Sequence, residues 1–75
     1  MKRFLGMMPR DEVEVEKTYI DDIGYKITIQ AGCNGWTIIW ADGGTTSKDE
    51  SSDAQKNFDK AYNTAVESLG NLKEV

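Results

Sequence analysis

Apolar and polar residues alternate along three short stretches of the chain. The stretches are residues 12–20, 25–31 and 36–41. A period of two residues is typical of a β-strand with one buried face. Asn34 and Gly35, which lie between the second and third stretches, are a strong two-residue hairpin signal. The pattern therefore predicts a three-stranded antiparallel meander with strand order 1-2-3.

The two predicted hairpins can be aligned so that their apolar residues share one face. A three-residue loop in the first hairpin places Tyr19 opposite Tyr25, and the Asn-Gly turn in the second places Ala31 opposite Ile38. Since a slip by one residue would move every side chain to the other face, agreement between the hairpins supports this alignment. Lys17 is the one charged residue on the apolar face. We expect its stem to pack there while its ammonium group extends past the sheet edge.

The hydrophobic period changes to that of a helix after residue 50. Apolar residues at helical spacing form one stripe: Ala54, Phe58, Ala61, Tyr62, Ala65 and Leu69. Two capping boxes compete for the helix start, Ser47 with Glu50 and Ser52 with Gln55. Gly70 predicts the end of the helix. The predicted fold class is α+β, a βββα arrangement in which one C-terminal amphipathic helix packs on one face of the meander.

The chain has 75 residues, which is the length of one small domain. We expect a loosely ordered leader at residues 1–10, a single βββα domain at residues 11–70 and a C-terminal tail at residues 71–75. Residues 42–47 contain only Asp, Gly, Thr and Ser, and they predict a turn or loop between the third strand and the helix, with a very short fourth strand at Thr45 and Thr46 as the alternative.

Composition excludes several classes of chemistry. The chain has no His and one Cys, which rules out a Ser-His-Asp triad, a Cys-His dyad, His-ligated zinc, a Cys-rich metal site and an internal disulfide. We therefore predict no catalytic residue, no metal site and no cofactor, and we expect that the protein is not an enzyme. The absence of a disulfide framework fits the cytoplasm.

The net charge of the chain argues against two classes of binding partner, nucleic acids and anionic membranes. Lys and Arg total 9 and Asp and Glu total 13, a net charge of −4. This balance argues against direct binding of nucleic acid, which needs clustered Lys or Arg, and against binding to an anionic membrane surface. No apolar run approaches the length of a transmembrane helix. We expect a protein partner of basic character, and a chain that is a monomer or a weak homodimer.

Three other features suggest chemistry but have a simpler structural interpretation. Cys33 has no basic residue close to it in sequence that would favour a reactive thiolate, so we interpret it as a packing residue. Asp21 and Asp22 are interpreted as turn formers, because neither they nor the later acids have the spacing of a calcium loop. Trp36 and Trp40 fall on the apolar face and are predicted to lie in the core.

Alternating glutamates give the strongest functional signal. They lie in the first strand, which we expect at an edge of the sheet, and they project from its polar face. We predict that this face binds a protein through seven residues: Glu12, Glu14, Glu16, Thr28, Gln30, Thr37 and Ile39. Ile39 is the apolar anchor of the set. The outer edge of the third strand is the alternative docking site, where a partner or a second copy would add a strand.

The predicted function is a small acidic, non-enzymatic protein-binding module, such as an inhibitor of a basic, nucleic-acid-binding protein. The alternatives are a self-associating structural or assembly protein and an antitoxin-like small domain. Residues 22–29, followed by a strand and a helix with Ala54, Ala61 and Ala65, resemble the small sheet-plus-helix domain of HicB-type antitoxins. The Pro-containing and Gly-Cys segments of that family do not align with this chain. In size and acidity the chain also resembles phage-encoded inhibitors, including anti-CRISPR proteins, which implies a phage or mobile-element protein.

Overall fold

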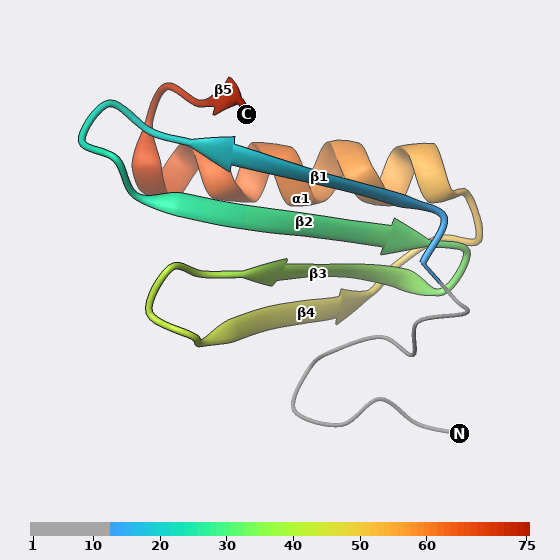
Figure 1. Ribbon diagram of the computed structural model, residues 1–75. Coiled ribbons are helices and arrows are strands. Elements are labelled where there is room, and N and C mark those ends of the chain that lie inside the picture. The colour runs from blue at the N-terminus through green and yellow to red at the C-terminus, as the bar shows by residue number, and fades with distance from the viewer. Residues whose placement is uncertain (1–12) are drawn as a thin grey trace.

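The computed structural model describes residues 13–75, which form a five-stranded antiparallel sheet with one helix packed on one face (Figure 1). The elements in chain order are β1 (Val15–Ile20), β2 (Lys26–Gly32), β3 (Gly35–Ile39), β4 (Thr45–Asp49), α1 (Ala54–Leu69) and β5 (Lys73–Glu74). The order of strands across the sheet is β4-β3-β2-β1-β5. The α+β class, the antiparallel meander and the C-terminal helix are confirmed, with two strands more than the three expected.

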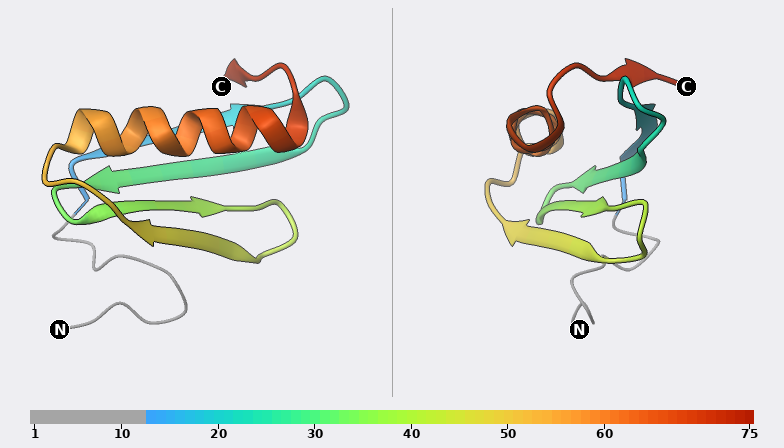
Figure 2. Two further views of the ribbon diagram at one scale, coloured as in Figure 1. Left: turned by 180° about the vertical axis from the view of Figure 1, so that it is seen from behind. Right: turned by 90° about the vertical axis from the view of Figure 1, so that its left-hand side faces the viewer.

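The helix connects the two edges of the sheet. It follows β4 at one edge, crosses the apolar face, and leads into β5, which pairs with β1 at the other edge (Figure 2). β5 lies within the segment expected as a C-terminal tail, and it pairs Lys73 with Ile20 and Glu74 with Tyr19. Hence β1 is not the outermost strand where β5 covers it.

The expected loop at residues 42–47 is wrong in its second half, because β4 begins at Thr45. The alternative, a fourth strand at Thr45 and Thr46, is confirmed in its position, but the strand continues to Asp49. A tight turn starts the strand: Trp40 N donates to Gly44 O at 2.8 Å, and Gly43 N donates to Trp40 O at 3.0 Å. Gly43 has a φ of 94°, a conformation that glycine adopts without steric cost. β4 consists of polar residues, so it lacks the alternation of apolar side chains that marks the other strands.

The register of both predicted hairpins differs by two residues from the expected one. Tyr19 lies opposite Ile27 rather than Tyr25, and Ala31 lies opposite Trp36 rather than Ile38. A shift of two residues keeps every side chain on its face, so the prediction of which residues face the core still holds.

The first hairpin departs from the expected register because its loop is longer. The Asp21 carboxylate accepts hydrogen bonds from the backbone N–H groups of Ile23 at 3.0 Å and Tyr25 at 2.7 Å. These bonds hold Tyr25 in the loop, and the ladder begins one residue later, at Lys26 opposite Ile20. Asp21 is therefore a turn former, as predicted.

In the second hairpin the turn lies one residue earlier than expected. Gly32 pairs with Gly35, so Cys33 and Asn34 are the two central residues. Gly35 is paired on its other side with Asp49, and it has a φ of 154°. A Cβ atom at Gly35 would collide with the backbone oxygen of Lys48 and would lie 2.9 Å from the Cα atom of Asp49. This glycine serves the close approach of β3 and β4 rather than the turn.

The core lies between the sheet and α1. Its buried apolar residues are Tyr19, Ile27, Ile29, Ala31, Trp36, Ile38, Phe58, Ala61 and Ala65. The predicted helix stripe is confirmed at Phe58, Ala61 and Ala65, while Tyr62 and Leu69 are half-buried. Trp40 is also half-buried and packs at the margin of the core.

Lys17 lies beside an aromatic cluster at the margin of the core. Its Nζ atom is 5.9 Å from the centroid of the Phe58 ring and 3.9 Å from a Glu74 carboxylate oxygen. The Tyr19 ring lies 5.3 Å from the Tyr62 ring and 6.4 Å from the Phe58 ring, measured between centroids. The exposed ammonium group of Lys17 thus stays at the surface over an aromatic face, which agrees with the expectation for this residue.

The two ends of the helix are capped in different ways. Asp53 is the N-cap, and its carboxylate accepts from the backbone N–H groups of Gln55 at 2.9 Å and Lys56 at 3.4 Å. Neither predicted capping box supplies this residue. Gly70 ends the helix as predicted, with a φ of 89° and its N–H donating to Val66 O at 2.7 Å.

Asn57 is a fully buried polar residue on the helix face that packs against the sheet. Its Nδ2 atom donates to Gly32 O at 2.6 Å and to Ser51 O at 2.9 Å. Its Oδ1 atom accepts from Ser51 N at 3.0 Å. One amide thereby joins the first turns of α1, the end of β2 and the segment between β4 and α1.

Candidate binding surface

Of the residues predicted to bind a partner, those that the structure describes lie on the sheet face opposite α1, because they alternate with the core residues along each strand. The register aligns residues of this face in two rows that each cross four strands. The first row is Glu16, Gln30, Thr37 and Ser47. The second row is Thr18, Thr28, Ile39 and Thr45. We call these eight residues the polar rows.

The predicted residues differ in exposure. Glu14 and Glu16 are exposed, and Thr28 and Ile39 are half-buried. Gln30 and Thr37, in the two central strands, are buried. Glu12 was also predicted to belong to the site, and it lies outside the described residues. The accessible part of the predicted set therefore consists of the two glutamates together with Thr28 and Ile39.

Side-chain hydrogen bonds join strands within the polar rows. Gln30 Nε2 donates to Glu16 Oε2 at 3.1 Å, which links β2 to β1 in the first row. The hydroxyl oxygens of Thr18 and Thr28 are 3.3 Å apart and link the same two strands in the second row. These contacts hold neighbouring side chains in a fixed arrangement on the face.

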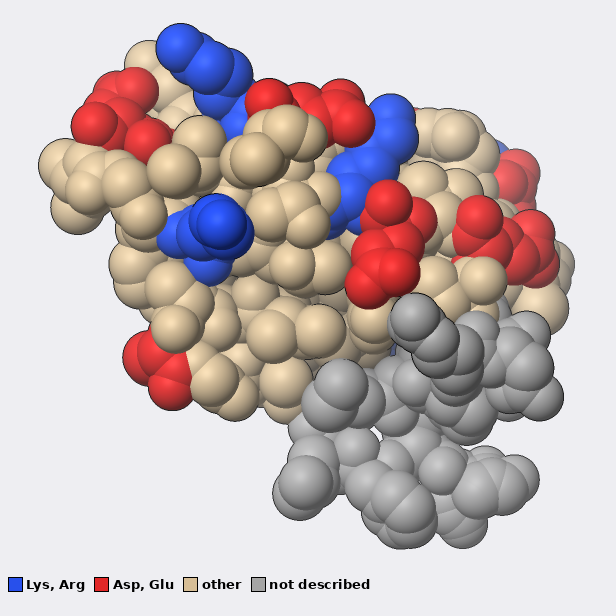
Figure 3. Space-filling model, in the orientation of Figure 1, with Lys and Arg blue, Asp and Glu red and all other residues tan. Residues whose placement is uncertain are grey.

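Charge on this face is uneven. Glu14 and Glu16 lie near the end of the face where β1 begins, while Lys26 shares a side of β2 with Thr28 and Gln30 near the opposite end. Figure 3 shows this face, with charged groups of both signs around an uncharged centre. Within the described residues, the expected acidic surface is thus an acidic end rather than a continuous patch.

The alternative docking site at the edge of the third strand is wrong. β4 pairs with β3 along its whole length, from Gly35 with Asp49 to Ile39 with Thr45. The backbone groups on that side of β3 are therefore engaged within the sheet. The sequence pattern does not reveal this strand at its full length. β4 consists of polar residues, so it has no alternation of apolar and polar side chains.

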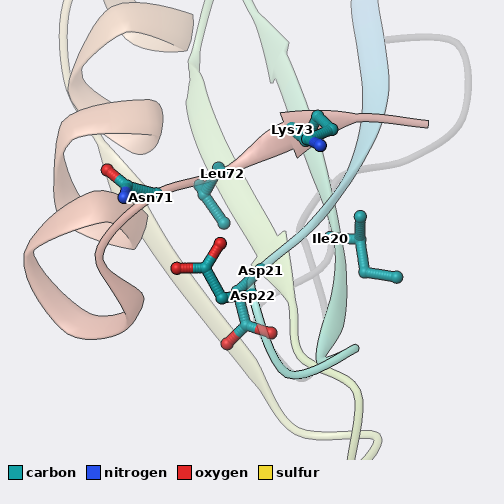
Figure 4. Close-up of a pocket in the computed structure, with 6 residues that line it drawn as sticks. All are labelled: Ile20, Asp21, Asp22, Asn71, Leu72 and Lys73. Carbon is teal, nitrogen blue, oxygen red and sulfur yellow. The ribbon is translucent and has the colours of Figure 1, made fainter.

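A small cavity lies at the end of the sheet opposite the acidic end. It is formed between the β1–β2 loop and the segment from α1 to β5 (Figure 4). Its volume is about 210 Å³, and its lining residues are Ile20, Asp21, Asp22, Asn71, Leu72 and Lys73. Asp21 and Asp22 bring negative charge to the lining, and Lys73 brings positive charge. Asp21 is held by the loop hydrogen bonds described above.

Metal-ligand side chains and the cysteine are placed as follows in the described part of the chain. Among residues 13–75, no group of three or more Cys, Asp or Glu side chains is arranged to hold a metal ion. Cys33 is exposed at the centre of the β2–β3 turn, so its expected role as a packing residue is wrong. The cause is the turn position, which moves Cys33 out of the ladder.

Asn57 is the structurally important polar residue that sequence reasoning missed. Its signal is its spacing: it lies three residues after Ala54 and four before Ala61, on the same side of the helix. A polar residue at a core-facing helical position implies a buried hydrogen-bond partner.

Comparison with known proteins gives no relative from which to infer a role. No protein-family model matches the chain, and no curated protein or solved structure matches it. Over residues 13–75, no helix combines the length and apolar character needed to cross a membrane.

Proposed function

We propose that this chain is a non-enzymatic protein-binding module that docks the sheet face opposite α1 on a basic partner protein. The observation that carries the proposal is the pair of polar rows with two exposed glutamates at one end. The other face of the sheet is occupied by α1, so within the described residues the polar rows lie on the sheet face that the helix does not cover.

The chemistry of the surface favours a basic partner. Glu14 and Glu16 are exposed carboxylates on a chain whose net charge is −4. Complementary charge raises the rate of association and sets the orientation of two proteins, and its effect falls with added salt. Ile39 supplies an apolar contact beside the uncharged residues. A nucleic-acid-binding protein, whose own surface is rich in Lys and Arg, has the required character.

The experiment is a capture with the full chain, followed by a quantitative titration. A basic protein recovered from a lysate is purified and titrated with the parent chain and with a Glu14→Lys/Glu16→Lys variant. We expect a 1:1 complex with the parent and about tenfold weaker binding by the variant at low salt, on the order of 1.4 kcal/mol.

A matched control separates position from net charge. The Asp59→Lys/Glu67→Lys variant changes the net charge by the same amount, but both residues are exposed on α1. We expect this variant to bind almost as the parent does. Equal weakening by both variants, or no weakening by either, overturns the proposed surface. Recovery of the chain alone, with a solution mass that rises with concentration, replaces the proposal with self-association.

A further inference from the structure

Gln30 is the one residue of the polar rows that is buried with an unfulfilled hydrogen-bonding atom. It is only 6% exposed, and within the described residues its Oε1 atom has no hydrogen-bond partner. Its Nε2 atom donates to Glu16 Oε2 at 3.1 Å. Only the NH₂ group can donate to a carboxylate, so this bond fixes which end of the amide lacks a partner.

A buried acceptor without a partner lowers the stability of the free protein, because it has lost water and gained nothing in return. Such a group is rare in folded proteins and needs a physical explanation. Gln30 lies beside the exposed carboxylate of Glu16, on the face that the proposed function assigns to a partner. A donor brought by that partner would remove the penalty.

We propose that Glu16 and Gln30 form an acceptor site for an arginine side chain of the basic partner. This inference rests on the proposed function and names the contact at the centre of that surface. A guanidinium group has five N–H donors in one plane, so it can donate to the Glu16 carboxylate and to Gln30 Oε1 at once. The amide must shift toward the surface to make this contact, because its oxygen is buried in the free protein.

The neighbourhood suits the rest of an arginine side chain. Ile39 lies diagonally across the β2–β3 pair from Gln30, since Gln30 opposes Thr37. Diagonal neighbours in a sheet are within reach of a long side chain, so the arginine methylenes can pack on the Ile39 side chain. Lysine has a single compact ammonium group and satisfies the two acceptors less well.

The test uses the full chain and a defined probe, the peptide acetyl-Gly-Arg-Gly-amide. We expect the peptide to shift the side-chain amide signals of Gln30 and the backbone signals of Glu16 and Thr37 in a nuclear magnetic resonance titration that saturates. The same peptide with citrulline, which is neutral, should produce much smaller shifts. Shifts confined to the Asp21 and Asp22 region, or equal shifts with both peptides, overturn the inference.

The Gln30→Met variant provides a second readout, because methionine has a similar length and no buried acceptor. We expect a higher midpoint of urea unfolding than the parent, together with at least tenfold weaker binding of the arginine peptide. A lower midpoint shows that the amide as a whole stabilises the free protein, so that its buried oxygen carries no penalty for a partner to relieve, and overturns the inference. If the captured partner binds Gln30→Met as tightly as the parent but loses affinity for the Glu14→Lys/Glu16→Lys variant, the proposed function stands and the arginine site does not.

Discussion

Replacement of Asn57 by alanine tests whether one buried amide joins the helix to the sheet. In the Asn57→Ala variant, the partners of the amide lose their hydrogen bonds: Gly32 O, Ser51 O and Ser51 N. Asn57 is fully buried, so water does not replace these bonds without a local opening of the structure. The side chain itself contributes little apolar burial, which makes hydrogen bonding the main quantity that the substitution removes.

The magnitude follows from the exposure of the three groups. Gly32 is buried, and an unsatisfied buried carbonyl costs about 1–3 kcal/mol. Ser51 is half-buried, so its N–H and C=O groups are partly rehydrated and add about 1 kcal/mol together. We therefore expect the free energy of unfolding to fall by about 3 kcal/mol. A domain of this length has a total stability of roughly 4–11 kcal/mol, so the loss is a large fraction of the whole.

The assay is urea unfolding followed by the fluorescence of Trp36 and Trp40, with thermal unfolding beside it. A loss of about 3 kcal/mol lowers the thermal midpoint by roughly 12–24 °C in a domain of this size. Asn63→Ala is the matched control, because Asn63 is exposed on the same helix and its replacement should change stability by less than about 0.5 kcal/mol. If Asn57→Ala unfolds within about 0.5 kcal/mol of Asn63→Ala, the amide is not the link we describe.

Two further predictions concern the start of the helix and a buried tyrosine. Asp53→Ala should lower the free energy of unfolding, measured in urea, by about 1 kcal/mol, because Asp53 caps the helix. Ser52→Ala should be nearly neutral. If Ser52→Ala were instead the more destabilising variant, the capping box predicted from the sequence would be the correct one. Burial, then Glu74 and Tyr62, raise the pKa of Tyr19 above its ordinary value of 10.0. The folded state therefore holds this proton more tightly than the unfolded state, and the stability it contributes is present below pH 10.0 and is lost as the pH rises through the higher folded-state pKa. Urea unfolding at about pH 8 and about pH 11 should show a larger loss in the parent than in Tyr19→Phe, and equal losses would contradict the assignment.

The sequence predicts correctly which face of the sheet each side chain occupies, but it does not predict the register between the strands. The reason is physical. Side-chain alternation has a period of two, so any shift by two residues gives the same apolar face. Two local features decide between the alternatives. One is the Asp21 carboxylate, which closes a longer loop by binding two backbone N–H groups. The other is the close approach of β4 to Gly35, which involves a strand with no apolar pattern of its own.

The candidate surface was predictable in outline only. The alternation of Glu14, Glu16 and the threonines shows which residues lie opposite the core. Alternation does not show that Gln30 is buried, or that its oxygen lacks a partner, because both depend on neighbours in adjacent strands. The two-residue shift also changes the pairing: Gln30 lies opposite Glu16 and Thr37 only in the observed register.

The position of α1 after all four strands of the meander affects how the chain folds during synthesis. The hairpins of β1–β4 are local in sequence and can form as soon as they emerge. Until the helix follows, their apolar face, with Ile27, Ile29 and Ile38, has nothing to pack against. A nascent or truncated chain that ends before α1 therefore carries an exposed hydrophobic sheet, which is the kind of species that aggregates or recruits chaperones. Docking of the helix is then the step that buries this apolar face.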